Sequence, residues 1–150
     1  MQAGEASRVK AITWKVAIPL VSVAVIYGAA FVLDRAYPDK FYDCERDTSD
    51  LNGGMKTYGD KKYSVVLCGT GGDESFMHDH IRIQVFSETG YLLAQRKFYV
   101  DWQTNFPRRI EYGPDYLTYF DASQQSGFKH RISMPPTWLD WIRARLPLVS

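Results

Sequence analysis

Residues 81–100 read IRIQVFSETGYLLAQRKFYV, and this stretch decides the fold. Residues 81–87 alternate apolar and polar side chains, which is the pattern of a strand that buries one face. Residues 88–90 form a short turn, and residues 91–100 return as a second apolar-rich strand. The stretch therefore predicts a β-hairpin.

Further strands are predicted on both sides of this hairpin. Residues 63–68, YSVVLC, are typical of a buried strand, and residues 109–112, 116–121 and 129–134 supply more strands between turn-forming segments. We therefore expect an α+β fold with a mainly antiparallel β sheet of five or six strands and one C-terminal helix. A single N-terminal transmembrane helix would precede this domain.

The C-terminal helix is predicted from its start signals. Pro135 and Pro136 end the last strand, and Thr137 can cap a helix in which Asp140 follows three residues later. Two tryptophans, Trp138 and Trp141, then lie at helical spacing. We expect them to pack on the sheet, and the alternative is an aromatic partner surface near the C-terminus.

The N-terminal segment has the composition of a membrane span. Residues 16–33, VAIPLVSVAVIYGAAFVL, are 18 uncharged residues. As a helix they would extend roughly 27 Å, close to the hydrocarbon thickness of a bilayer. Three basic residues precede the segment and mixed charges follow it, so the positive-inside rule assigns residues 1–11 to the cytoplasm and residues 12–33 to the membrane.

Two alternatives to this anchor remain open. Residues 28–30, Gly-Ala-Ala, have the small side chains that a signal peptidase reads, so the segment could be cleaved after Ala30. The uninterrupted apolar residues 31–33 favour an uncleaved anchor instead. A buried core helix usually has a polar stripe, which residues 16–33 lack.

The rest of the chain is predicted to lie outside the cytoplasm. Residues 34–59 are polar and rich in turn signals, so we expect a linker or irregular lead-in, with a β-rich periplasmic domain over residues 60–150. Cys44 and Cys68 are the only cysteines, and both fall in this exported part. We expect one structural disulfide between them, with free buried thiols as the alternative.

The charge of the exported part excludes one class of partner. Of the 18 basic and 17 acidic side chains, three and one precede residue 34, which leaves 15 basic and 16 acidic side chains in residues 34–150. A nucleic-acid binder needs a basic field that releases counterions from phosphates. We therefore expect no nucleic-acid partner.

A few residues could carry chemistry. His78 and His80 lie on one side of an extended strand, with Asp73 and Glu74 nearby as oxygen ligands, so a metal-dependent enzyme is one hypothesis. A structural zinc site usually needs four defined ligands, and a solvated loop is the simpler interpretation. The sequence also lacks a GxSxG motif. We therefore expect no enzyme, no metal and no cofactor.

Two groups of residues are the predicted partner-binding surfaces. The first is the acidic loop over residues 71–80, and the second is a basic edge. The residues assigned to partner binding are Asp73, Glu74, His78, His80, Arg108 and Arg109.

Several motifs carry a resemblance to a known group of proteins. They are GTGGDE at 69–74, YGPDY at 112–116, YFDAS at 119–123, ISMPP at 132–136 and LDWIRARLP at 139–147. Over residues 63–147 the chain resembles small inner-membrane-anchored periplasmic proteins of bacterial type VI secretion effector and immunity clusters. The resemblance implies an immunity protein that sterically blocks a secreted effector, a lipase-like toxin, at the bacterial inner membrane. The alternative is a bitopic structural or assembly subunit whose helix itself makes specific contacts.

Overall fold

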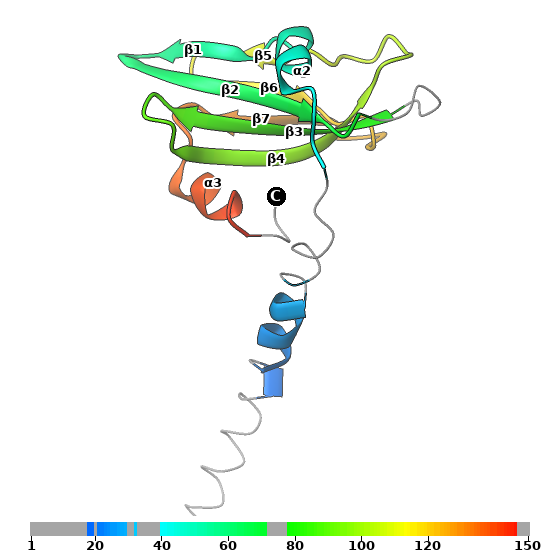
Figure 1. Cartoon of the computed structure of the whole chain (residues 1–150), viewed down its shortest axis with the longest axis vertical. Helices are drawn as coiled ribbons and strands as arrows, with labels where there is room; N and C mark the ends of the chain where they lie inside the picture. The colour runs from blue at the N-terminus through cyan, green and yellow to red at the C-terminus, as the bar shows by residue number, and fades with distance from the viewer. Residues whose placement is uncertain (1–17, 20, 30–31, 33–39, 72–77, 147–150) are drawn as a thin grey trace, which may run out of the picture. The chain divides into compact units, whose positions relative to one another are not determined.

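The computed structural model describes residues 18–19, 21–29, 32, 40–71 and 78–146 (Figure 1). The chain divides into two compact units, Met1–Pro38 and Asp39–Ser150. The second unit contains every named strand and both named helices, in the order α2, β1 to β7 and α3.

The described residues of the first unit are helical. Residues 18–19 and 21–29 have helical backbone with exposed side chains, and the Ser22 hydroxyl donates a hydrogen bond to the Ile18 carbonyl at 2.9 Å. Over the described ranges, no helix combines the length and the apolar character that a membrane crossing requires. The rest of residues 12–33, and all of residues 1–11, lie outside the described residues. The transmembrane anchor therefore stays a prediction.

The first sheet of the second unit has four antiparallel strands that neighbour one another in chain order. They are β1 (Gly54–Tyr58), β2 (Lys61–Gly69), β3 (His78–Ser87) and β4 (Leu92–Asp101). In the β3–β4 pair, Ile81 lies opposite Phe98 and Val85 lies opposite Ala94, so apolar side chains share one face. The predicted hairpin over residues 81–100 is confirmed.

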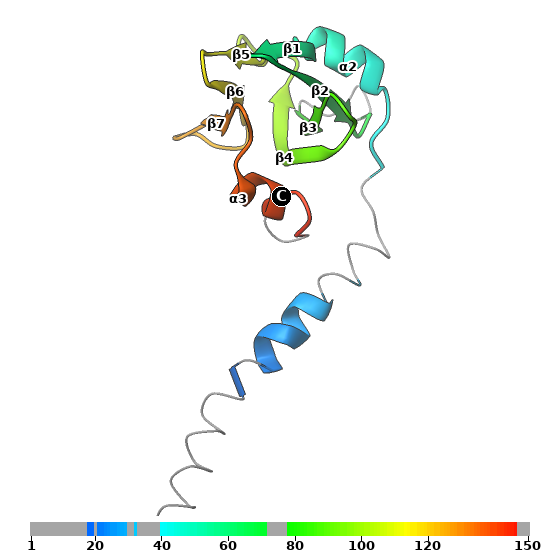
Figure 2. The same ribbon diagram turned by 90° about the vertical axis from the view of Figure 1, so that its left-hand side faces the viewer.

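A second sheet covers the apolar face of the first (Figure 2). Its antiparallel strands are β5 (Glu111–Tyr112), β6 (Tyr116–Phe120) and β7 (Lys129–Ser133). The antiparallel α+β class is confirmed, but the expected single sheet of five or six strands is wrong. The described residues form seven strands in two sheets, because the apolar face of one sheet must be buried against a second layer.

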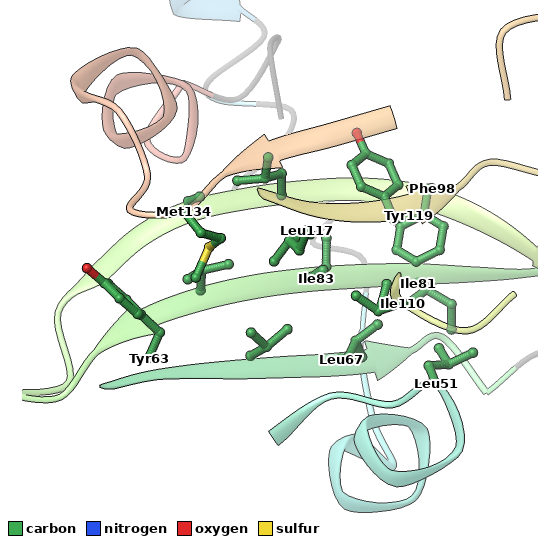
Figure 3. Packing of buried hydrophobic residues seen from close by; sticks show 14 of the residues in the cluster. Leu51, Tyr63, Leu67, Ile81, Ile83, Phe98, Ile110, Leu117, Tyr119 and Met134 are labelled. Atoms are coloured by element: carbon green, nitrogen blue, oxygen red, sulfur yellow. The ribbon is translucent and has the colours of Figure 1, made fainter. Parts of the chain in front are cut away.

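The hydrophobic core lies between the two sheets. Figure 3 shows side chains from both layers, among them Ile83 of β3 and Leu117 of β6, pointing into this common core. The aromatic rings of Phe98 and Tyr119 also meet there, with 5.0 Å between their centroids. The two sheets therefore share one core and form one domain.

Residues 34–59, expected to be a linker or irregular lead-in, contain regular structure from Cys44 onward, namely α2 (Cys44–Asp50) and β1. β1 pairs only with residues 61–65 of β2. Residues 66–69 continue the strand beyond the end of β1, and α2 lies against this part. The lead-in is therefore an integral part of the domain.

The side chains of α2 bind the edge of β2 that β1 leaves open. Thr48 Oγ1 accepts a hydrogen bond from the Leu67 N–H at 2.9 Å and donates one to the Leu67 carbonyl at 3.1 Å. The Asp47 carboxylate accepts one from the Gly69 N–H at 2.6 Å. These bonds satisfy backbone groups that would otherwise be unpaired at a sheet edge.

The predicted disulfide between Cys44 and Cys68 is confirmed. It joins the first residue of α2 to β2 across a sequence separation of 24 residues. Closing a loop of this size stabilises a protein by roughly 3 to 4 kcal/mol in the chain-entropy model. The bond and the side-chain contacts of α2 thus hold the same two elements together.

The C-terminal helix α3 (Trp138–Arg143) starts with the predicted cap. Thr137 and Asp140 form a reciprocal capping box. Asp140 is buried, and its carboxylate forms an ion pair with Arg96 of β4. The helix therefore turns its acidic residue, and not its aromatic residues, toward the sheet.

The expectation that both tryptophans pack on the sheet is wrong. Trp138 is 69% exposed and Trp141 is 47% exposed. A helix of six residues has few inward positions, and the pairing of Asp140 with Arg96 fixes which side of α3 faces β4. Both indole rings are consequently left at the surface.

Replacing Asp140 by asparagine tests this ion pair. Removal of one partner from a buried pair typically costs about 3 to 5 kcal/mol, because the other charge stays buried without compensation. We expect Asp140→Asn to lower the free energy of unfolding by this amount in urea titrations. Asp60→Asn, at the exposed β1–β2 turn, is the matched control and should change it by less than about 0.5 kcal/mol. Equal stability of the two variants would contradict the assignment.

Candidate partner-binding surface

Two loops leave the domain at the end where β4 and β6 finish, which we call the loop end. His78, the first residue of β3, pairs with Asp101, the last residue of β4. The Tyr99 N–H donates to the Asp121 carboxylate at 3.2 Å, and the Ala122 N–H donates to the Tyr99 carbonyl at 2.8 Å. The β4–β5 loop and the β6–β7 loop therefore start side by side.

The β4–β5 loop borders an open groove of about 700 Å³, which we call the loop-end groove. Aromatic, basic and acidic side chains from the β4–β5 loop, the second sheet and the end of α2 line it. They include Trp102, Phe106, Arg108, Arg109, Glu111 and Phe120.

Asp101 fixes the first turn of the β4–β5 loop. Its carboxylate accepts hydrogen bonds from the backbone N–H groups of Gln103 and Thr104, at 2.9 and 3.0 Å. The Thr104 hydroxyl donates a third bond at 2.7 Å. An aspartate that binds the backbone two and three residues ahead is a common way to start a turn. The wall of the groove is consequently tied to the end of β4.

Aromatic packing joins the two loops. The Phe106 ring meets the Phe128 ring edge to face, with 5.2 Å between centroids, and Phe128 lies 6.4 Å from Phe120. Phe106 comes from the β4–β5 loop, whereas Phe128 comes from the β6–β7 loop. Such pairs contribute beyond the apolar area that they bury. The loops therefore form one surface and not two independent segments.

The two predicted arginines both line the loop-end groove. The Arg108 guanidinium lies 5.5 Å from the centroid of the Trp102 ring and donates to the Trp102 carbonyl at 3.2 Å. Arg109 donates to the Asp50 carbonyl at 3.2 Å. Within residues 40–71 and 78–146, neither guanidinium has a carboxylate at ion-pair distance. The groove thus presents two guanidinium groups, one of them beside an aromatic ring, together with the carboxylates of Asp50 and Glu111 in its lining.

Asp121 fixes the start of the second loop. Burial alone would raise the pKa of Asp121, but hydrogen bonds from Ser123 and Tyr99 and the nearby His130 outweigh burial and lower it below its ordinary value. The Ser123 hydroxyl and N–H both donate to this carboxylate, at 2.7 and 3.0 Å. Asp121 is therefore held in its charged form at neutral pH.

His80 lies in a different place from the two arginines. Its ring stacks on Tyr99 with 4.7 Å between centroids and also contacts Phe41 at 5.8 Å. Arg82 lies over the Phe41 ring at 4.4 Å. Because β3 side chains alternate, His80 and Arg82 point away from the core that buries Ile81. The histidine therefore belongs to the outer face of the first sheet.

The remaining predicted site residues belong to the connection between β2 and β3. Asp73 and Glu74 lie outside the described residues, while His78 opens β3 opposite Asp101. In the part of the chain that the structure describes, no three His, Cys, Asp or Glu side chains are grouped as a metal site would require.

The sequence prediction missed the aromatic half of the groove. It singled out Arg108 and Arg109 but not Trp102 or Phe106. The signal lies in residues 101–109, DWQTNFPRR, where two large aromatic residues interrupt a polar, turn-forming segment directly after a strand. Both rings are partly buried, and Trp102 also packs against the core, so each presents only part of its surface to a partner.

The fold and the groove define a small two-sheet α+β domain with an open aromatic and basic surface at one end. No protein-family model matches the chain, and no match was found among curated proteins or solved structures.

The pKa of Asp121 gives a prediction for acid. A carboxylate whose pKa is lowered by folding stabilises the protein above its unfolded pKa of about 3.8, and this contribution is lost as the pH falls through the folded value. We expect Asp121→Asn to lower stability by about 1 to 3 kcal/mol at pH 7, the range for hydrogen bonds to a charged group.

Thermal unfolding of both proteins between pH 7 and pH 2.5 measures this effect. The Tm difference should be constant down to about pH 5 and shrink below about pH 3.8. Ser123→Ala, which removes one donor and keeps the charge, should give a smaller difference. A Tm difference that grows in acid would contradict the assignment.

Proposed function

We propose that this protein is a membrane-anchored periplasmic binding protein. Specifically, we propose an immunity protein that blocks a cognate type VI secretion effector, a lipase-like toxin, by steric occlusion. The loop-end groove is the surface that contacts the toxin. Arg108 and Arg109, which were predicted for this role, supply its charge, and Trp102 and Phe106 supply its apolar area.

The observation that carries this proposal is the contact between Arg108 and Trp102. The guanidinium lies beside an indole ring, and no carboxylate of the described residues pairs with it. Arginine and tryptophan are the residue types most enriched among interface hot spots. A charge held in place by its own loop is also preorganised, which reduces the entropy lost on binding.

The chemistry of the groove indicates what its partner presents. Arg108 and Arg109 are without a carboxylate partner among the described residues, whereas Glu111 pairs with Lys129, so the two guanidinium groups can bind a carboxylate of the partner despite Asp50 in the same lining. The adjoining aromatic rings accept an apolar side chain. A loop of the effector with an acidic residue beside an apolar one fits both features. A toxin whose active-site entrance carries such a loop would be covered when the groove binds it.

The predicted anchor supports the same function. A segment of 18 uncharged residues precedes the domain, and an inner-membrane anchor would keep the inhibitor where a lipase-like toxin acts. Fixing the inhibitor to that surface raises its effective concentration near the toxin's substrate.

Binding of the effector encoded next to this gene tests the proposal. We expect the full chain in detergent to bind that effector and to inhibit its lipid hydrolysis at a one-to-one ratio. Trp102→Ala or Arg108→Ala should weaken binding about 30-fold or more, which corresponds to a hot-spot loss of about 2 kcal/mol. Titration calorimetry and a lipase assay give the two readouts.

The basic pair Lys61 and Lys62 provides the matched control. Both are exposed at the start of β2, and neither lines the groove. Replacing both with alanine removes as much charge as replacing both groove arginines, but should change Kd less than threefold. Loss of affinity in this control and not in the groove variants would move the binding site elsewhere. No binding by the intact chain would refute the immunity proposal.

Exchanging the membrane segment separates immunity from an assembly role. We expect cells to stay protected from the toxin when residues 16–33 are replaced by an unrelated single-pass anchor, because the exported domain alone makes the inhibitory contact. Survival of cells exposed to the effector is the readout, with equal protein levels checked by immunoblot. Loss of protection by a delivered, folded domain would instead favour a bitopic assembly subunit whose helix makes specific contacts.

A further inference from the structure

Helix α3 presents an exposed aromatic surface that the proposed toxin contact does not use. Trp138, Leu139 and Trp141 are 69%, 47% and 47% exposed, and we call these three residues the tryptophan face. Helix α3 lies beside β4 (Figure 1), and its opposite side is attached there by the ion pair between Asp140 and Arg96. Packing against β4 therefore leaves this face uncovered.

The acidic residue of α3 faces the sheet, and the basic residues at its C-terminal end are exposed. Its only carboxylate, Asp140, is turned inward and neutralised by Arg96. Arg143 and Arg145 are exposed, and the Arg145 guanidinium lies 3.9 Å from the centroid of the Trp141 ring. The outer side of this region consequently combines indole rings with positive charge and carries no acidic residue of the helix.

The predicted anchor would keep the start of the domain close to a bilayer. The compact domain starts at Asp39, six residues after the predicted end of the membrane segment at Leu33. Six residues span at most about 20 Å even when fully extended. If residues 12–33 cross the membrane, the start of the domain at Asp39 lies within about 20 Å of the end of the span.

We propose that the tryptophan face binds the surface of the anchoring membrane, with its indole rings at the boundary between headgroups and acyl chains. This inference rests on the proposed anchor. Tryptophan is enriched at that boundary because its ring is apolar while its N–H donates hydrogen bonds. Arg143 and Arg145 bind anionic phospholipid headgroups beside the rings.

The geometry lets the membrane contact and the toxin contact occur together. Arg145 donates a hydrogen bond to the carbonyl of Leu92, at the start of β4, whereas the groove begins with Trp102, after the end of β4. The nearest part of β4 that α3 contacts, Arg96, precedes Trp102 by six residues, which is about 20 Å of extended strand. Membrane contact through α3 therefore leaves the loop-end groove open to a partner.

Tryptophan quenching by brominated lipid tests the proposal. The full chain carries Trp14→Phe, which removes the indole in the predicted anchor, and is reconstituted into phosphatidylethanolamine–phosphatidylglycerol vesicles with bromine at carbons 6 and 7. We expect emission to fall at least 1.5-fold relative to vesicles without bromine. Trp138→Ser with Trp141→Ser in the same background leaves only Trp102, whose emission should be unchanged.

Two further variants control for charge and for exposed apolar surface. Arg143→Gln should reduce the quenching in phosphatidylglycerol vesicles and have no effect in purely zwitterionic ones. Met55→Ser removes an apolar side chain that is 59% exposed on β1, at the other edge of the first sheet, and should leave quenching unchanged. Circular dichroism checks that each variant is folded.

The possible outcomes separate the two proposals. A chain that floats with the vesicles without quenching overturns the membrane contact of α3 and leaves the anchor intact. Quenching that survives loss of both tryptophans overturns it as well. Sedimentation that shows a dimer, which the Trp138→Ser and Trp141→Ser changes convert to a monomer, would also overturn it, because a second copy would then cover the tryptophan face. A chain that does not float at all refutes the anchor and, with it, this inference, while toxin binding is measured independently.

Discussion

The structure depends on how the second half of β2 is paired. β1 begins opposite Val65 of β2, so residues 66–69 would expose backbone donors and acceptors at a sheet edge, which is costly and invites aggregation. Asp47 and Thr48 of α2 bind that edge, and the disulfide from Cys44 holds the helix there. Gly69 is required, because a Cβ at this position would come within 2.7 Å of the Asp47 carboxylate.

The Asp47 carboxylate is buried at this edge. Burial raises its pKa, and the hydrogen bonds that it accepts from the Gly69 N–H and from Arg46 oppose this rise.

The attachment of α2 to β2 also positions the candidate binding surface. The segment after α2 binds the strand that follows the groove, because the Ile110 N–H donates to the Leu51 carbonyl and the Asn52 side chain donates to the Ile110 carbonyl, both at 2.9 Å. Arg109 is held by the carbonyl of Asp50, at the last residue of α2. One wall of the groove is therefore built on the helix that completes β2.

The sequence predicted those elements that depend on residues close together in the chain. The alternation in residues 81–100 gave the hairpin, and the spacing of Thr137 and Asp140 gave the start of α3. Helix α2 was missed because its sequence, CERDTSD, has no apolar stripe. The helix is attached to β2 by side-chain hydrogen bonds and not by the burial of apolar side chains. The division into two sheets was also missed, because periodicity shows which side of a strand is buried but not which strand lies beside it.

The same limit explains why the aromatic surfaces were assigned wrongly or missed. Helical spacing places Trp138 and Trp141 on α3, but only the long-range pairing of Asp140 with Arg96 decides which side of the helix meets the sheet. An apolar residue is normally assumed to be buried, and that assumption fails where a buried ion pair occupies the inward position. Because the ion pair occupies the inward side of α3, the two tryptophans are left free to contact a partner. The exposed tryptophans of α3 lie along the first half of β4, whereas the partly buried Trp102 follows its end, so the same strand positions both surfaces.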